Sequence, residues 1–163
     1  MAKVKAKGVA VYVYRQAQSE VEFLQLRRSG HAGEYQRSWQ TVYGGIKKKE
    51  TAVEAAIREL YEETGLEAQA MFQVEYLESF YFRPRDVVMV MPVFAAQAAT
   101  GATVKINEEH DDFRWVRQDE LTKHFVWRTQ REALQIICED ILAPQPALAL
   151  ELLRIDVKQP GGT

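Results

Sequence analysis

The hydrophobic positions near the N-terminus fall in two short runs that are separated by polar residues. Val9–Tyr14 and Val21–Arg27 are rich in β-branched and aromatic residues, which favour strands. The polar residues 16–19 between the two runs suit a hairpin connection. The chain is therefore predicted to begin with two paired strands.

Further along the chain, apolar runs and polar breaks predict four more strands and two long helices. A polar loop is predicted over residues 29–38. The predicted strands are Trp39–Ile46, Phe72–Phe82, Val87–Ala96 and Phe113–Val116. The predicted long helices are Thr51–Thr64 and Thr129–Leu142, with a helical turn over Gln118–Lys123 and a short helix over Leu148–Leu153. Pro144 and Pro146 end the second long helix, and residues 159–163 are expected to be frayed.

The length of 163 residues suits one domain with a substantial core and is too short for two ordinary domains. We assign residues 1–143 to this domain and residues 144–163 to a C-terminal extension, a short helix followed by a frayed tail. Strands and helices are mixed along the chain, which favours an α/β fold with a sheet between helices.

Composition and charge narrow the range of partners. The chain has 21 Lys and Arg against 23 Asp and Glu, a net charge of −2, so it does not attract polyanions as a whole, and general nucleic-acid binding is not expected. Its single cysteine, Cys138, favours a reducing, cytoplasmic location. No apolar stretch approaches the ~18–20 residues needed to cross a bilayer, so no membrane association is expected.

The first long helix has signals at both of its ends. Thr51 and Glu54 have the spacing of a capping box, in which each side chain bonds the backbone of the other residue. Gly65 follows the last turn as a stop signal. The apolar residues of the helix are spaced to form one buried stripe, comprising Val53, Ala56, Ile57 and Leu60.

Three acids, Glu59, Glu62 and Glu63, lie off that predicted stripe, with spacings that place them close together. Carboxylates near a helix C-terminus oppose the dipole, each at about 0.3–1 kcal/mol when exposed. Arg58 pairs with Glu62 at i+4, but one arginine does not neutralise three acids. A hard divalent cation does, and Mg²⁺ is the expected one. The alternative interpretation is a solvated acidic face.

The spacing around these acids matches a known motif. Gly44, Glu50 and Arg58–Leu66 fit the pattern G-x5-E-x7-R-E-U-x-E-E-x-G-U, with U apolar, at every specified position. This segment resembles the Nudix box. The resemblance implies a Nudix-like α/β/α sandwich with a mixed β-sheet between helices, in which the box forms a loop–helix–loop that binds divalent metal.

The resemblance also implies roles for individual residues. Glu59 and Glu63 would be the main ligands of Mg²⁺, with Mn²⁺ as a second candidate ion, and Glu62 would support them. Arg58 would orient a carboxylate, and Glu50 would lie at the edge of the site. By the same resemblance, Gly44 would allow a sharp turn beside the metal. Residues 47–49 are three lysines where relatives usually carry an acid and a glycine. They are either solvated or attract phosphate.

Segments outside the box resemble one branch of the family. Four segments are similar to Nudix pyrophosphatases that act on dATP or dihydroneopterin triphosphate. They are Ser38–Gln40, Asn107–His110, Phe113–Val116 and Trp127–Leu134. That similarity implies hydrolysis of a nucleoside triphosphate-like substrate to a monophosphate and pyrophosphate. It also makes Glu109 a candidate metal ligand or general base, and the alternative is a solvated acid.

Two other functions stay open. The spacing from Trp39 to Ile46 also resembles dinucleoside-polyphosphate and RNA 5′-pyrophosphohydrolases, and a non-catalytic Nudix domain would bind a nucleotide as a sensor. In each case the partner is a nucleotide or related small-molecule diphosphate, and a homodimer is left open.

The predicted substrate-binding residues are Arg27, Trp39, Gln40, Gly44, Gly45 and Tyr81. Aromatic residues in strands more often belong to the core than to a stacking site.

Overall fold

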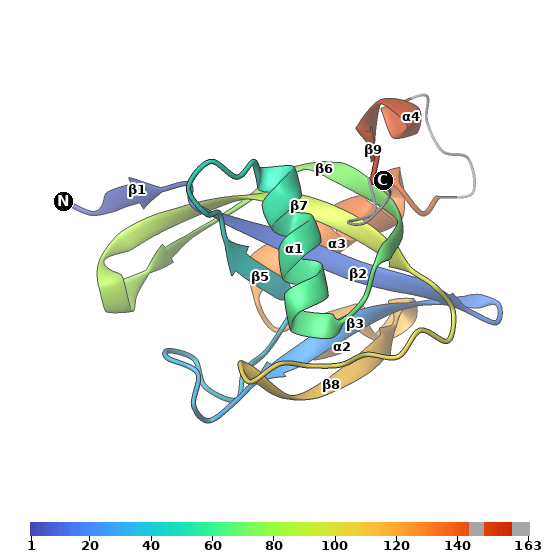
Figure 1. The fold of residues 1–163 in the computed structure, drawn as a ribbon, viewed down its shortest axis with the longest axis horizontal. Coiled ribbons are helices and arrows are strands. Elements are labelled where there is room, and N and C mark those ends of the chain that lie inside the picture. The colour runs from blue at the N-terminus through green and yellow to red at the C-terminus, as the bar shows by residue number, and fades with distance from the viewer. Residues whose placement is uncertain (144–148, 158–163) are drawn as a thin grey trace.

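The computed structural model describes residues 1–143 and 149–157, and it places a mixed sheet between helices (Figure 1). The strands are Lys3–Lys5 (β1), Gly8–Ala17 (β2), Glu20–Arg28 (β3), Trp39–Gln40 (β4), Val42–Gly45 (β5), Ala68–Phe82 (β6), Val87–Ala98 (β7), His110–Arg117 (β8) and Arg154–Ile155 (β9). The helices are Ala52–Thr64 (α1), Leu121–His124 (α2), Arg128–Asp140 (α3) and Ala149–Leu153 (α4), with 3-10 turns at Arg83–Arg85 and Gln118–Glu120.

The sheet has the order β4-β3-β2-β7-β6-β9, with β1 beside β7, β5 beside β2 and β8 beside β3. The pairs β2–β7 and β1–β7 are parallel, and the other pairs are antiparallel. Figure 1 shows α1 on one face of the sheet and α3 on the other. The predicted α/β class is therefore confirmed.

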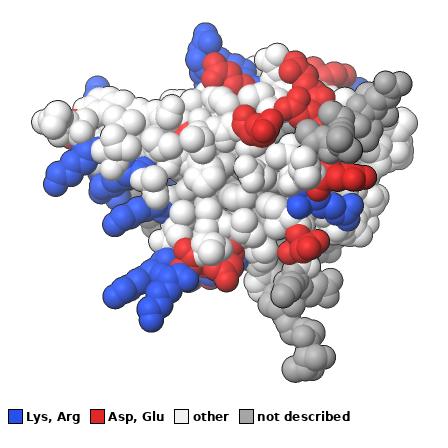
Figure 2. All heavy atoms as spheres, turned by 90° about the horizontal axis from the view of Figure 1, so that it is seen from above, with Lys and Arg blue, Asp and Glu red and all other residues white. Residues whose placement is uncertain are grey.

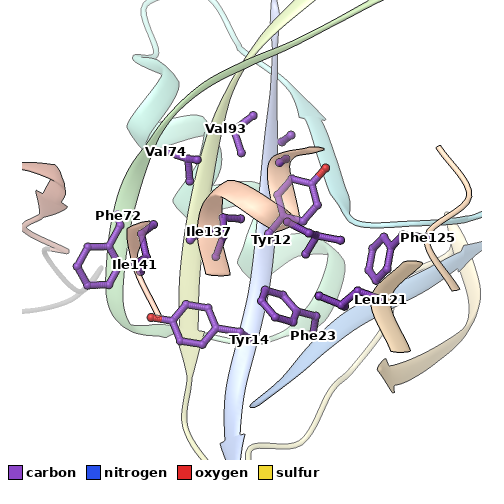
Figure 3. Packing of buried hydrophobic residues seen from close by; sticks show 14 of the residues in the cluster. Tyr12, Tyr14, Phe23, Phe72, Val74, Val93, Leu121, Phe125, Ile137 and Ile141 are labelled. Carbon is purple, nitrogen blue, oxygen red and sulfur yellow. The ribbon is translucent and has the colours of Figure 1, made fainter. Parts of the chain in front are cut away.

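Strand β2 explains why the molecule has two apolar layers. Successive side chains of a strand point to opposite faces, and a strand covered on both faces is apolar throughout. Val9, Val11 and Val13 belong to the cluster on the α1 face. The alternate residues of β2 belong to the cluster on the α3 face, where side chains from the sheet surround α3 (Figure 3). The site described below lies at the edge of the α1 layer.

Several elements differ from their predicted bounds. The predicted strand Trp39–Ile46 divides into β4 and β5, because the chain passes at Thr41 from pairing with β3 to pairing with β2. The Thr41 hydroxyl donates to the carbonyl oxygen of Val11 at 2.6 Å and holds this crossing in place. Strand β1 was not predicted, since its exposed lysines carry no strand pattern. Strands β6 and β8 each begin a few residues before the predicted start.

The C-terminal region agrees with the predicted short helix where it is described. Helix α4 covers Ala149–Leu153, and β9 then pairs with β6 through Ile155 and Met71. Three predictions fall outside the described residues. They are the helix end at Pro144 and Pro146, the first residue of the short helix at 148, and the frayed tail at 159–163. In the part of the chain that the structure covers, no helix is long and apolar enough to span a bilayer.

Charged side chains are distributed unevenly on the face seen in Figure 2. Lys and Arg gather mainly toward one end of this face, Asp and Glu form separate groups, and a broad uncharged area lies between them. A nucleic-acid binder typically presents a basic stripe along one face. The described residues on this face form separate groups of both signs, in keeping with the nearly balanced composition.

Candidate active site

Helix α1 begins and ends as the sequence predicts. The backbone N–H of Glu54 donates to the Thr51 hydroxyl at 3.2 Å, and the Glu54 carboxylate accepts from the Thr51 N–H at 2.8 Å. Gly65 has a φ of 68°, in the left-handed region, and its N–H donates to the carbonyl oxygen of Tyr61 at 2.8 Å. The predicted capping box and glycine stop are therefore confirmed.

The buried face of α1 differs from the predicted stripe. Ala56 and Leu60 are buried as predicted, but Val53 and Ile57 are only half-buried. Glu63 was predicted to lie off the buried face, and this prediction is wrong, because its side chain is 2% exposed. The segment after β7 covers the C-terminal end of the helix, where the N–H of residue 105 donates to the carbonyl oxygen of residue 64 at 2.7 Å.

Arg58 holds together the loop before α1 and two acids of the helix. Its guanidinium donates to both carboxylate oxygens of Glu50, at 2.7 and 2.9 Å, and to the carbonyl oxygen of Gly45 at 2.7 Å. It also donates to Glu59 at 2.6 Å and to Glu62 at 3.0 Å, which confirms the predicted i+4 pair. The Arg58 guanidinium lowers the pKa of Glu50 to about 2. Glu50 therefore stays charged and anchors the arginine.

Gly44 lies directly against Glu59. A Cβ atom built on Gly44 would lie 2.0 Å from the Cδ of Glu59, which is closer than atoms of a real side chain approach. The φ of Gly44 lies outside the left-handed region, so a positive φ is not the reason for glycine at this position. Glycine is needed here because the carboxylate of Glu59 occupies the space of a side chain.

Glu63 is a buried carboxylate without a neutralising partner in contact. Its Oε2 atom accepts no hydrogen bond from the described residues. The Nε2 atom of His110 lies 3.9 Å from Oε2 of Glu63. Burial raises the pKa of Glu63 well above its ordinary value, and the charges of Glu109 and Glu59 raise it further. The fold therefore concentrates acidic side chains at the C-terminal end of α1, where burial disfavours the charged form of Glu63.

His110 does not supply the missing positive charge. Burial, and then the charge of Arg28, lower the pKa of His110 to about 4, so the imidazole is neutral at pH 7. Both of its ring nitrogens lack hydrogen-bond partners among the described residues. Arg28 is the cation whose charge lowers the pKa of Glu63, but burial and the acids outweigh it. A buried charge that is not compensated is costly, which favours a cation at this position.

The acids fit a hard divalent cation by their chemistry. Glu59, Glu63 and Glu109 offer carboxylate oxygens, which Mg²⁺ and Mn²⁺ prefer. Glu63 has a free buried oxygen atom, and Glu59 lies in the space left by Gly44. Among residues 1–143 and 149–157, no three His, Cys, Asp or Glu side chains are already drawn together as a metal cage.

The predicted substrate-binding residues outside the box form a separate group. Arg27 lies opposite Trp39 on the paired strands β3 and β4, and its guanidinium binds Asp111 at 2.6 Å. The Trp39 ring lies under the guanidinium of Arg114 at 4.0 Å. Gln40, next to Trp39, is buried. The structure thus brings together Arg27 and Trp39, but with arginine and aspartate neighbours rather than with the box acids.

Tyr81 lies away from that group. It is exposed near the end of β6, and its hydroxyl donates to Asp86 at 2.8 Å, across the turn that follows the strand.

Sequence reasoning did not single out His110 as part of the site. His110 lies next to Glu109 in the segment Asn107–His110, which resembles relatives. The proximity of His110 to Glu63 is not visible in sequence spacing, because the two residues are 47 positions apart along the chain. The available signal was the general expectation that charged side chains lie close to an acidic helix.

Comparison with known proteins adds a family match. The family model of the NUDIX domain matches residues 4–135. An octanoyltransferase of Myxococcus xanthus is 31% identical over 113 residues, 68% of this chain and 30% of that protein. An RNA pyrophosphohydrolase of Brucella anthropi is 54% identical over 35 residues, 22% of this chain and 20% of that protein. The chain thus matches less than a third of the length of these curated relatives.

A solved structure shares the fold. The dihydroneopterin triphosphate pyrophosphohydrolase of E. coli has a TM-score of 0.67 and 20% identity, over 83% of this chain and 96% of that chain. At this identity the similarity concerns the fold. It confirms the α/β/α arrangement that the sequence motif implied.

Proposed function

Because the chain belongs to the NUDIX domain family, we propose that it is a Mg²⁺-dependent hydrolase that cleaves a pyrophosphate bond of a nucleoside triphosphate-like substrate. The proposed substrates are dATP, another NTP or dihydroneopterin triphosphate, with a monophosphate and pyrophosphate as products. The observation that carries the proposal is the free, buried carboxylate oxygen of Glu63 beside Glu59 and Glu109.

We propose that Glu59, Glu63 and Glu109 hold the cation, with Glu62 in support and Mn²⁺ as a second candidate ion. A bound divalent cation neutralises the polyphosphate and lowers the pKa of a bound water. Arg58 keeps Glu59 in place through its 2.6 Å contact. Gly44 allows that placement, since a larger residue would collide with the Glu59 carboxylate.

Glu109 is the candidate general base as well as a candidate ligand. Its side chain is exposed, while its carbonyl oxygen accepts from the N–H of Ser29 at 2.8 Å, so its backbone is fixed beside the end of β3. An exposed carboxylate on a fixed backbone is able to reach a water beside the cation. Arg27, Trp39, Gln40, Gly45 and Tyr81 remain candidates for substrate binding.

The proposal is tested with a substrate panel and one isosteric variant. Purified protein is assayed with dATP, other NTPs, dihydroneopterin triphosphate, diadenosine tetraphosphate and 5′-triphosphorylated RNA, with and without Mg²⁺. We expect Mg²⁺-dependent release of pyrophosphate, and Glu63→Gln should lower kcat by a factor of at least about 10², because it removes a ligand charge. Exposed Glu67→Gln is the matched control and should keep the wild-type kcat.

The panel also separates two other functions. A dinucleoside-polyphosphate or RNA 5′-pyrophosphohydrolase is supported by the 54% identity over 35 residues with an RNA pyrophosphohydrolase, and it would act on the last two substrates in preference to the others. A non-catalytic sensor would turn over none of them, yet one would raise the melting temperature. Wild-type kcat in Glu63→Gln would contradict the proposed metal site.

Location and partners extend the proposal. We place the protein in the cytoplasm on the basis of its single cysteine, with a small nucleotide or related diphosphate as its partner.

A further inference from the structure

Three aromatic side chains from distant parts of the chain meet at the surface. Tyr35 comes from the loop over residues 29–38, Phe82 from the end of β6 and Trp127 from the residue before α3. The ring centres of Tyr35 and Phe82 are 5.6 Å apart, and those of Tyr35 and Trp127 are 5.5 Å apart, both edge-to-face. We call these residues the aromatic cluster.

The aromatic cluster is held in place but remains accessible to solvent. Tyr35 is 47% exposed and Trp127 is 43% exposed. Tyr35 has a φ of 56°, which is uncommon for a bulky residue. Arg28 fixes the loop, since its N–H donates to the carbonyl oxygen of Ser38 at 3.0 Å and its Nε donates to that of Glu34 at 3.0 Å. Large rings held in water at a fixed position favour a binding role.

The aromatic cluster is linked to the candidate active site on two sides. On one side, Ser29 follows Arg28 at the start of the Tyr35 loop, and its N–H donates to the carbonyl oxygen of Glu109 at 2.8 Å. On the other side, the first turn of α3 follows Trp127, and Gln130 in that turn donates to the hydroxyl of Tyr43 at 3.0 Å. Tyr43 directly precedes Gly44.

Two other aromatic residues near the site are already engaged. The guanidinium carbon of Arg114 lies 4.0 Å from the centre of the Trp39 ring, and that of Arg27 lies 5.7 Å from it. Tyr43 is turned into the α3 layer, where its hydroxyl donates to Glu78 at 2.6 Å. Tyr35 and Trp127 of the aromatic cluster are therefore more accessible than Trp39 and Tyr43.

We infer that the aromatic cluster binds the planar heterocycle of the substrate, while the acids of α1 hold the cation at its phosphates. This inference rests on the proposed function and adds to it the residues that bind the ring of the substrate. Stacking suits such a ring because every nucleobase or related heterocycle has a π-face, whatever its hydrogen-bonding edge. Arg85, whose guanidinium lies 5.9 Å from the Phe82 ring centre, adds a cation beside the cluster.

The test compares a ligand with a ring and a ligand without one. The full chain with Mg²⁺ is assayed on the best nucleoside triphosphate of the panel, and inorganic tripolyphosphate serves as the ring-free competitive inhibitor. We expect Trp127→Ala to raise KM about tenfold or more, with kcat within about threefold and the inhibition constant of tripolyphosphate unchanged; tenfold corresponds to ~1.4 kcal/mol. Trp127→Phe should restore most of the affinity.

The control is Tyr61→Ala, which removes an exposed aromatic ring from α1, away from the cluster. It should leave KM unchanged. An unchanged KM in both Trp127→Ala and Tyr35→Ala overturns the inference, and so does an equal loss for the nucleotide and for tripolyphosphate. A change of oligomeric state in Trp127→Ala, seen by sedimentation, also overturns it, because the cluster would then be a subunit contact.

Failure of the proposed function gives a different result. If the wild type hydrolyses no member of the panel, equilibrium binding of ATP to the wild type and to Trp127→Ala is measured in Mg²⁺. Binding that weakens about tenfold in the variant supports the ring site without catalysis, and equal binding overturns it. Circular dichroism confirms that each variant is folded.

Discussion

At the scale of single residues, the candidate site depends on one missing Cβ atom. Gly44 and Glu59 belong to different elements, and the carboxylate of Glu59 occupies the space that a side chain at position 44 would need. Arg58 then holds the same carboxylate from the other side at 2.6 Å. Contact with Glu59, rather than a special φ, therefore determines that residue 44 is glycine.

We predict that Gly44→Ala lowers kcat about tenfold or more and weakens activation by Mg²⁺, because Glu59 has to turn away. The melting temperature should change little, since the far end of a flexible side chain is what moves. Steady-state assays over a Mg²⁺ series measure the effect. In Gly45→Ala, a new Cβ would meet only the carbonyl oxygen of Lys7 at 3.9 Å, so its effect should be smaller. Equal losses in both variants would contradict the packing argument.

The sequence predicts the box residues but not their surroundings. Arg58 and Glu62 are four residues apart on one helix, so their 3.0 Å pair follows from helix geometry. His110 lies 3.9 Å from Glu63, and Arg28 acts on Glu63 through its charge. Both residues belong to strands whose placement depends on the whole sheet. Spacing along the chain therefore does not show whether a positive side chain lies close enough to neutralise Glu63.

At the scale of elements, local signals predict where α1 begins and ends but not which of its faces is buried. Thr51 and Gly65 act on backbone groups a few residues away, which makes both signals readable in sequence. Burial depends on what covers the helix. The segment around Lys105 bonds to the last turn, and Glu63 in that turn is buried, which a count of apolar positions cannot show.

A second buried acid joins four elements on the other face of the sheet. Glu78 of β6 accepts hydrogen bonds from the hydroxyl groups of Tyr12 in β2 and Tyr43 in β5, and Tyr43 in turn accepts from Gln130 in α3 at 3.0 Å. Burial raises the pKa of Glu78, although the two tyrosine hydroxyls lower it. This network ties the strand that carries Gly44 to the α3 layer.

The raised pKa of Glu78 predicts a pH-dependent stability. The folded state binds the proton more tightly than the unfolded state, so this contribution is complete below the ordinary pKa of 4.5 and is lost as the pH rises through the raised value. Glu78→Gln removes it. The free energy of unfolding of the variant, minus that of the wild type, should therefore increase as the pH rises from 4 to 8, as measured by urea denaturation.

The matched control for this prediction is Glu75→Gln, an exposed acid on the same strand. Its difference from the wild type should stay flat over the same range. A flat difference for Glu78→Gln, or one that falls with pH, would show that Glu78 is charged in the folded protein.

At the scale of the whole molecule, sheet order is the feature that local patterns leave undetermined. The parallel pairing of β2 with β7 joins residues about 80 positions apart, such as Val11 and Phe94. Strand patterns do not specify such partners, and β1 and β9 are too short to have a pattern at all. The family motif predicts the fold only because proteins that share the motif also share the sheet topology.

The whole molecule should also be more stable with its cation than without it. A ligand that binds only the folded state stabilises it by about 2.7 kcal/mol at 100 times its Kd, which raises the melting temperature of a chain of this size by about 5–11 °C. The acids around Glu63 repel one another until a cation is present, so Mg²⁺ should produce this shift and EDTA should reverse it, as followed by calorimetry.

Two controls separate binding from general screening of charge. NaCl at equal ionic strength weakens repulsion between exposed acids, but it does not fill a site beside the buried oxygen atom of Glu63. The shift should therefore be specific to divalent ions and should largely disappear in Glu63→Gln. The metal-free variant should melt at or above the wild-type temperature, because it no longer buries an ionisable group without a partner. Equal shifts with NaCl and MgCl₂, or an undiminished shift in the variant, would mean that Glu63 does not bind the ion.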